Sequence, residues 1–366
     1  MTEFDALLRL NMTKGIGIRT YIALVERFGS SEAILAAPRA ALETVPGIGP
    51  KLANAIVEES RTIDIAAEIH LAKEKDVQII PYTSEQYPKH LKTIYDPPLV
   101  LYVKGNILEA DILALAIVGA RRCTYYGLSQ AERFGRLLAQ RGLCIVSGMA
   151  RGIDTAAHRG AIGSHGRTIA VLGCGLGVIY PRENIELAEQ IVQHGAIISE
   201  FPMNTPPDFR NFPPRNRLIS GLSLGVLVVE SSLKSGSLIT AQWALEQGKE
   251  VFAIPGNIDN IYSRGTHKLI KEGAKLVEDI TDIIQELGPI AETLNMSDAP
   301  ITNDPRSLSL NSQEKKIFSL LSSSPQDIDE IIRIAKLPAS VVTSTLLILE
   351  IKKLVKQLSG KRFVKA

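Results

Sequence analysis

Six short apolar segments, each followed by a turn rich in glycine or serine, lie between residues 113 and 254 of this 366-residue chain. Helical patterns such as 128–140 and 185–193 separate them. Buried strands that alternate with helices are typical of a parallel sheet with both faces covered. The sequence therefore predicts an α/β fold with an extended Rossmann-like parallel sheet. Its expected strands are 113–118, 143–146, 168–172, 196–198, 224–229 and 251–254.

The turns after these strands would lie together, because ligands in open parallel sheets bind outside the carboxyl ends of the strands. Small residues there leave room for a ligand close to the backbone. Five polar side chains project from the turns: Arg121, Arg151, Glu200, Glu230 and Asn257. The turns are GARR at 119–122, SGMARG at 147–152, GCGLG at 173–177, SEFP at 199–202, VESS at 229–232 and PGN at 255–257. We expect one long ligand-binding edge, which we call the strand-end edge.

Length and composition limit the class of protein. The chain exceeds one ordinary domain of roughly 100–200 residues, so we expect two or three domains. A formal net charge of +2 gives no global preference for a polyanion, so any nucleic-acid site must be local. Three cysteines without a CxxC pair indicate neither a zinc site nor a disulfide framework, and we expect no metal or other cofactor. No apolar run approaches the ~18 residues that span a bilayer, so we expect a cytoplasmic protein without a membrane partner.

The sequence on either side of the core predicts further domains. The front is helical, and VPGIGPKLANAI at 45–56 has the glycine hairpin and following helix of a helix-hairpin-helix unit. Such a hairpin can aim backbone N–H groups at a phosphate, with Lys51 adding charge, but it can equally serve packing or protein docking. A looser copy, KGIGIRTYIALVERFG, occupies 14–29, and a strand within 96–105 would extend the main sheet.

The last 56 residues are locally basic, with ten Lys or Arg against five Asp or Glu. Helical patterns at 313–321, 327–335 and 339–351 precede two alternating stretches at the C-terminus, which predicts a winged-helix module. Its third helix has basic residues only at its end, so DNA reading and protein docking both remain open. The expected division is a helix-hairpin-helix domain at 1–65, a core at 66–285, a proline-containing linker at 286–310 and a winged-helix domain at 311–366.

The segment PPDFRNFPPRNRLISG at 206–221 interleaves three arginines with two phenylalanines. Guanidinium groups bind phosphate through paired donors, and aromatic rings stack on unpaired bases with ~1 to 3 kcal/mol per base. This combination suits single-stranded nucleic acid. The alternative is an arginine-rich surface loop whose phenylalanines fold into the core.

Other motifs point to anion binding rather than catalysis. Asp154 is a candidate helix cap, and His158 has no cysteine, serine or carboxylate partner nearby in sequence. The segment from Lys234 to Ser237 could cradle a phosphate but lacks the P-loop order, so ATP hydrolysis is not supported. GCGLGVIYPREN at 173–184 reads GxGxG with Tyr180 and Pro181 before the next helix, so we expect no NAD. Glu200 and Glu230 could pair with the arginines or contact a base edge.

With these motifs assembled, the chain closely resembles the bacterial DNA-processing protein A family, also called Smf. The resemblance is carried by GARR, SGMARGIDTAAH, GCGLGVIYPREN, SEFP, FPPRNRLISGLS, SGSLITAQWALEQGK and IPGN. It implies a protein that protects incoming single-stranded DNA in natural transformation, loads the recombinase RecA and dimerises near 261–277. We expect binding without catalysis, because no nucleophile, base and orienting residue occur together in the sequence. Position 182 is frequently lysine in the family, so Arg182 keeps the charge but changes the contact geometry.

Motif matching and the anion-binding patterns together define the predicted DNA-binding set. It comprises Gly119, Arg121, Ser147, Gly148, Gly173, Gly175, Arg182, Asn184, Arg210, Phe212, Arg215, Asn216, Arg217, Lys234, Ser235 and Gly236.

Two other functions compete with this prediction. The related lysine-decarboxylase-like proteins cleave nucleotide N-glycosidic bonds on a similar core, but they carry PGGxGTxxE where this chain has SGSLITAQ. A regulator that reads duplex DNA through the winged helix would lose its double-strand affinity on deletion of residues 311–366.

Overall fold

The computed structural model describes residues 2–288, 310–322, 324–352 and 354–365. Contacts among the described residues divide the chain into two compact units, one of residues 2–123 with 131–288 and one of residues 124–130 with the described residues from 310 onward. Most of the predicted linker at 286–310 lies outside the described residues.

The front of the first unit is helical, as predicted. A capping box between Thr2 and Asp5 starts the first helix, which satisfies two backbone donors that a helix N-terminus leaves unpaired. Glycine turns precede α2 and α5, the two helices that the hairpin motifs predicted. The helices are α1 (Glu3–Met12), α2 (Ile18–Phe28), α3 (Ser31–Ala36), α4 (Arg39–Leu42), α5 (Pro50–Val57), the 3₁₀ turn η1 (Glu59–Thr62) and α6 (Ile65–Glu74).

A nine-stranded sheet follows, in the order β1-β2-β6-β5-β4-β3-β7-β8-β9. The six predicted core strands are confirmed within one residue at either end, and all are parallel to their core neighbours. They are β3 (Ala114–Val118), β4 (Cys144–Ser147), β5 (Thr168–Leu172), β6 (Gly195–Ser199), β7 (Gly225–Val228) and β8 (Glu250–Ala253). The predicted strand within 96–105 is β2 (Val100–Gly105), which extends the sheet by antiparallel pairing with β6. The remaining strands are β1 (Val77–Pro81) and β9 (Lys275–Leu276).

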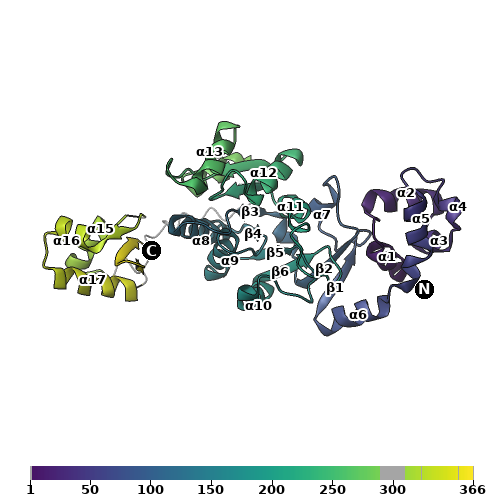
Figure 1. The fold of residues 1–366 in the computed structure, drawn as a ribbon, viewed down its shortest axis with the longest axis horizontal. Coiled ribbons are helices and arrows are strands. Elements are labelled where there is room, and N and C mark those ends of the chain that lie inside the picture. Colours follow the sequence, from purple (N-terminus) through teal and green to yellow (C-terminus); the bar gives the residue numbers. More distant parts are fainter. Residues whose placement is uncertain (1, 289–309, 323, 353, 366) are drawn as a thin grey trace. The chain divides into compact units, whose positions relative to one another are not determined.

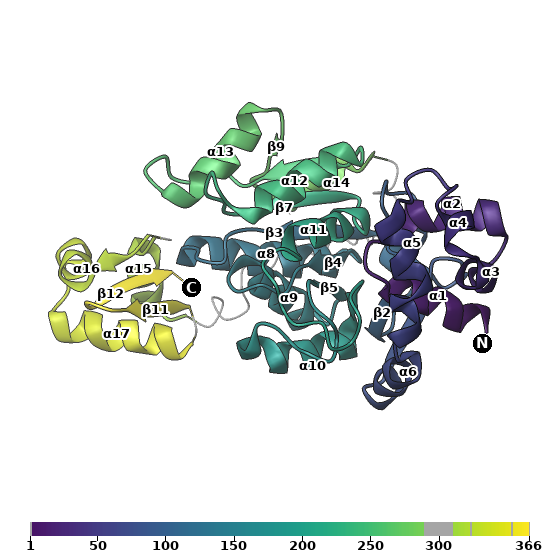
Figure 2. The ribbon, with the colours of Figure 1, turned by 45° about the vertical axis from the view of Figure 1, so that its right-hand side comes forward.

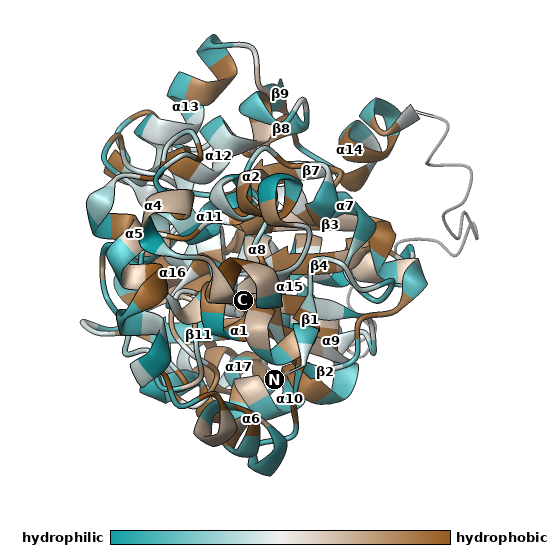
Figure 3. Ribbon diagram, turned by 90° about the vertical axis from the view of Figure 1, so that its right-hand side faces the viewer, coloured by the Kyte–Doolittle hydropathy of each residue, from teal (hydrophilic) through white to brown (hydrophobic). Residues whose placement is uncertain are grey.

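Helices cover both faces of this sheet (Figures 1 and 2). On one face, a buried apolar cluster joins the front domain to the sheet and α10. A second cluster on the other face joins the sheet to α7, α11, α12 and α13. Hydrophobic residues run along the central strands β3 and β4 (Figure 3). The covering helices are α7 (Lys89–Lys92), α8 (Tyr125–Gln140), α9 (Ile153–Gly163), α10 (Ile185–His194), α11 (Phe212–Gly221), α12 (Gly236–Glu246), α13 (Arg264–Lys271) and α14 (Ile280–Glu286), with 3₁₀ turns η2 (Glu109–Ile112), η3 (Arg182–Asn184) and η4 (Ile261–Ser263).

The C-terminal unit has the helices and wing that the sequence predicted, around its own apolar core. A short strand that the sequence pattern does not predict, β10, also pairs with the wing. The elements are α15 (Ser312–Leu320), β10 (Gln326–Asp327), α16 (Ile328–Ala335), α17 (Ala339–Ile351), β11 (Val355–Leu358) and β12 (Arg362–Lys365). Within the described residues, no single helix is long and apolar enough to cross a membrane; α16 and α17 meet the length and composition test only as a pair bent by 113°.

Candidate nucleic-acid interface

The strand order places a crevice between β3 and β7. From β3 the chain adds β4, β5 and β6 on one side, and then returns to add β7 and β8 on the other. Ligands of open α/β sheets bind at such a reversal, where successive turns leave toward opposite faces. The two turns touch here: the Ala120 amide donates to the Glu230 carbonyl at 2.7 Å. A Cβ on Gly119 would lie 2.6 Å from Ile153 Cγ1 and 2.8 Å from that carbonyl, so glycine permits the close approach.

A cavity of about 470 Å³ opens at this crevice. A smaller one of about 40 Å³ shares Arg121, Phe212 and Arg215 with it, and extends to Gly148, Gly173 and Tyr180. The larger cavity is also lined by Gly119, Arg122, Asn216, Ser235, Gly236 and Tyr262. The structure thus brings together the turns after β3, β4, β5 and β7 with the start of α11. The turns after β6 and β8, which the predicted strand-end edge also included, line neither cavity.

An aromatic and guanidinium cluster lies where the two cavities meet. The Arg121 guanidinium carbon is 5.0 Å from the centroid of the Phe212 ring, and Tyr180 stacks on the same ring at a centroid distance of 5.8 Å with an interplanar angle of 26°. Both Arg121 and Tyr180 are exposed. Among the described residues, no carboxylate lies within 4.0 Å of the Arg121 guanidinium, which leaves its donors available to a phosphate.

Arg215 lies beneath this cluster and is only 4% exposed. It donates to the carbonyls of Gly148 (3.1 Å) and Val171, and so ties two strand exits together. Asp154 accepts from the amides of Gly148 and Ala150 at 3.2 and 3.3 Å. Burial raises the pKa of Asp154 to about 6 despite the nearby Arg215, and burial lowers the pKa of Arg215 to about 10. Arg215 therefore supports the floor of the site from inside the protein.

The other arginines of 206–221 have carboxylate partners. Arg217 is buried and makes a bidentate pair with Glu200 at 2.6 and 2.7 Å, while its Nε donates to the Asp96 carbonyl. Exposed Arg210 pairs with Asp208 at 2.6 Å. The expectation that these arginines all face a ligand has to be corrected for Arg217, which lines neither cavity because α11 begins at Phe212 and turns it into the core. Arg215 is also buried, yet it lines both cavities.

Some of the remaining predicted residues are buried and hold the turns in place, and others are exposed outside the two cavities. Ser147 is buried and donates to the Ile117 carbonyl, and Asn184 is buried and donates to the Met149 carbonyl and to Thr155 Oγ1. Gly175 packs against the segment after β6 rather than facing the cavities. Lys234 and Arg182 are exposed, but neither is among the residues that line the two cavities.

Two titratable groups near the site have internal partners. His158 is fully buried with Nδ1 2.7 Å from Thr168 Oγ1, and desolvation lowers its pKa to about 3. Neutral at ordinary pH, it has no accessible reaction partner. Asp154 holds the turn after β4. His158 lines neither strand-end cavity, whereas Asp154 lines the larger one with its carboxylate bonded to the turn.

Tyr180, Arg122 and Tyr262 are site residues that the predicted set omitted. Arg122 has a sequence signal, as the second arginine of GARR, and Tyr180 has one in its position between the glycine turn and Arg182. Tyr262 comes from η4, far along the chain from Gly236, the last residue of the predicted set, so its approach depends on the tertiary fold.

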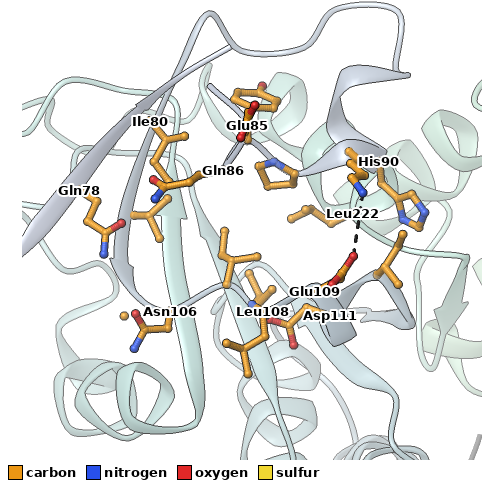
Figure 4. A pocket seen from close by; sticks show the side chains of 18 residues that line it. Gln78, Ile80, Glu85, Gln86, His90, Asn106, Leu108, Glu109, Asp111 and Leu222 are labelled. Atoms are coloured by element: carbon orange, nitrogen blue, oxygen red, sulfur yellow. Dashed lines mark hydrogen bonds and ion pairs between the residues drawn. The ribbon is translucent and has the colours of Figure 1, made fainter. Parts of the chain in front are cut away.

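A separate cavity of about 510 Å³ contains none of the predicted residues (Figure 4). It lies between β1, β2, α7 and η2, with Gln78, Gln86, His90 and Asn106 around apolar side chains such as Leu222. Lys89 and Glu109 approach to 4.0 Å across it.

Together, the parallel sheet, the helical front and the winged-helix module define a multidomain α/β protein with a Rossmann-like core. The model of the DNA recombination-mediator protein A family matches residues 78–288, and the chain belongs to this family. The DprA winged-helix domain matches residues 302–361, and a SAM-like tandem helix-hairpin-helix matches residues 4–62.

The chain is similar along nearly its whole length to Protein Smf of Synechocystis, with 33% identity over 96% of both chains. It is 51% identical to Protein Smf of Escherichia coli over 57% of this chain, a match that spans just over half (56%) of that protein. A crystal structure of DNA processing protein A from Streptococcus pneumoniae superposes with a TM-score of 0.66 and 36% identity, covering 78% of this chain and 98% of that one. A structure from Helicobacter pylori, described as showing a single-stranded DNA binding mode, has a TM-score of 0.52 and 34% identity over 58% of this chain and 95% of that one.

Proposed function

We propose that this protein binds single-stranded DNA at the strand-end edge, without catalysis, protects incoming DNA during natural transformation and loads RecA on it. Membership of the recombination-mediator family supports a DNA-processing role. The observation that carries the finer proposal is the cluster of Arg121, Phe212 and Tyr180 between two glycine turns. A guanidinium beside aromatic rings offers one group for a phosphate and others for an unpaired base.

A single-stranded ligand fits this site better than a duplex does. The aromatic rings lie in a crevice between turns, and stacked bases inside a duplex cannot reach such a surface without unpairing. The cavity of about 470 Å³ is also within the size range of small-ligand sites, which accommodates a base and its sugar.

The test is fluorescence anisotropy of labelled oligo-dT and of a matched duplex across a salt series. We expect a preference for the single strand. Arg121→Ala should weaken that binding roughly tenfold or more and make its salt dependence shallower by about 0.7 in slope for each phosphate that the variant no longer binds. Arg141→Ala is the matched control, since Arg141 is a cationic residue at the end of α8 that lines neither strand-end cavity. Equal affinity for both DNAs, or an unchanged slope in Arg121→Ala, would contradict the proposal.

We further propose a homodimer formed through 261–277. Ile261 and Leu276 are 59% and 41% exposed, and β9 is the last strand of the sheet, so apolar side chains and an open strand edge occur together. Ile261→Glu should convert a dimer into a monomer in light scattering coupled to gel filtration. A wild-type monomer at the same concentration would contradict this part of the proposal.

Loading of RecA is tested with Arg121→Ala, the variant of the DNA-binding experiment. RecA should assemble faster on oligo-dT that carries the wild-type protein than on oligo-dT that carries Arg121→Ala at matched total protein. Equal rates would separate RecA loading from the strand-end edge.

A further inference from the structure

Glu68 belongs to α6, before the segment that the recombination-mediator family model matches, yet its side chain reaches into the core of the unit. It is only 6% exposed, and its Oε1 accepts from the Met203 amide at 2.8 Å. Tyr102 of β2 is fully buried beside it, and burial together with this carboxylate raises the pKa of the Tyr102 hydroxyl. A buried carboxylate that accepts from a loop amide fixes that loop, because the amide has no water to replace the bond.

The loop that Glu68 holds is in turn bonded to the glycine turn after β5. The Gly177 amide donates to the Met203 carbonyl, and the Gly175 amide donates to the Thr205 carbonyl, both at 2.9 Å. A Cβ on Gly175 would overlap the carbonyls of Pro202 and Met203, so the two backbones are in direct contact. The turn therefore has little freedom to move independently of the segment 202–205.

The same turn borders the strand-end cavities. Gly173 and Cys174 line the smaller cavity together with Tyr180, the residue that stacks on Phe212. The Ser199 hydroxyl donates to the Cys174 carbonyl at 2.7 Å, which adds a second connection from the end of β6. A shift of the loop at 202–205 would consequently displace the backbone that carries the aromatic pair.

We infer that Glu68 is a positioning residue through which α6, the helix between the front domain and β1, sets the geometry of the turn at 173–177. Only the expected effect of Glu68 on DNA binding rests on the proposed function. Glu68 lines neither strand-end cavity, so its contribution passes through Met203. Helix α6 is then part of the support of the proposed binding site.

Three variants test this. Glu68→Ala removes the acceptor, Glu68→Gln keeps an oxygen that the Met203 amide can bond, and Asp64→Ala is the control, because Asp64 caps the same helix by accepting from the Ala67 amide. Amide hydrogen exchange is measured first, without DNA. Glu68→Ala should speed exchange at Gly175, Gly177 and Met203 at least tenfold, while Glu68→Gln and Asp64→Ala leave these amides near the wild-type rates.

Oligo-dT anisotropy is the second readout. Glu68→Ala should weaken binding about tenfold with an unchanged salt slope, since every phosphate-binding cation is still present, and Glu68→Gln should restore it. Unchanged exchange at 173–177 in Glu68→Ala, or faster exchange with wild-type affinity, would overturn the inference. If the wild type binds no single-stranded DNA, the proposed function fails, and the exchange rates alone still decide whether Glu68 holds the turn.

Discussion

Two arginines of the strand-end edge, Arg121 and Arg217, have opposite environments. Arg121 is exposed on the turn after β3 and lies beside an aromatic ring. Arg217 is buried in α11, where Glu200 binds it through two hydrogen bonds. A guanidinium whose donors are occupied by a half-buried carboxylate cannot bind a phosphate without leaving that carboxylate unpaired. Proximity of cations to an edge is therefore insufficient to identify its ligand contacts.

Replacing Arg217 should give the largest effect, on stability. Arg217→Ala leaves the Glu200 carboxylate, whose side chain is 18% exposed, without its partner, and should lower the free energy of unfolding by about 3–5 kcal/mol. Urea denaturation followed by circular dichroism measures this. Adding Glu200→Gln should recover part of that stability. A decrease in the free energy of unfolding of less than about 1 kcal/mol would mean that Arg217 contributes no more than an exposed arginine does.

The free energy of unfolding should depend on pH through Asp154, which holds the turn after β4. The pKa of Asp154 is about 6 in the fold against 3.8 as its ordinary value, so the folded protein holds this proton more tightly than the unfolded chain. Its contribution to stability is full below about pH 4 and is lost as pH rises to about 6. Asp154→Asn should therefore gain stability relative to wild type across this window, by up to about 3 kcal/mol. Thermal unfolding of both proteins at pH 4, 5, 6 and 7 checks it, and a constant difference would contradict it.

The aromatic side of the Arg121 region can be changed without altering charge. A Cβ on Gly173 would lie 2.7 Å from Phe212 Cδ1, so Gly173→Ala should displace the ring and weaken oligo-dT binding by roughly tenfold. The salt slope should stay at the wild-type value. Gly163→Ala, where a Cβ would meet nothing within 4 Å, is the control. Equal affinities of the two variants would remove Phe212 from the proposed contacts.

The smallest effect is expected in the winged helix. The exposed face of α17 includes Leu347, Ile348 and Ile351, with no cation among them, so it lacks the groups that bind phosphate. Leu347→Glu should change oligo-dT affinity by less than about twofold, within the range of surface substitutions. A large decrease would show that the third helix contacts DNA after all.

The parallel core could be predicted because each of its strands is a short buried run that ends in a small-residue turn, as at 168–172. Strand β1 could not be predicted in this way. Its sequence VQIIP has an exposed Gln78 and a terminal proline, as edge strands do, and the strand depends on β2 for its pairing. The position of the Arg121 site followed from the rule that turns after parallel strands share an edge. The partners of each arginine in 206–221 could not be predicted from the sequence. They depend on how α11 packs against α12 and β5, which turns the helix into the core after Phe212.

The antiparallel pairing of β2 with β6 also affects the order in which the chain can fold during synthesis. Residues 100–105 leave the ribosome about ninety residues before their partner strand at 195–199. Until then β2 has only β1 as a pairing partner. Because such non-local pairings form slowly and unpaired strand edges favour association, we expect the β1–β2 pair to join the core late in folding.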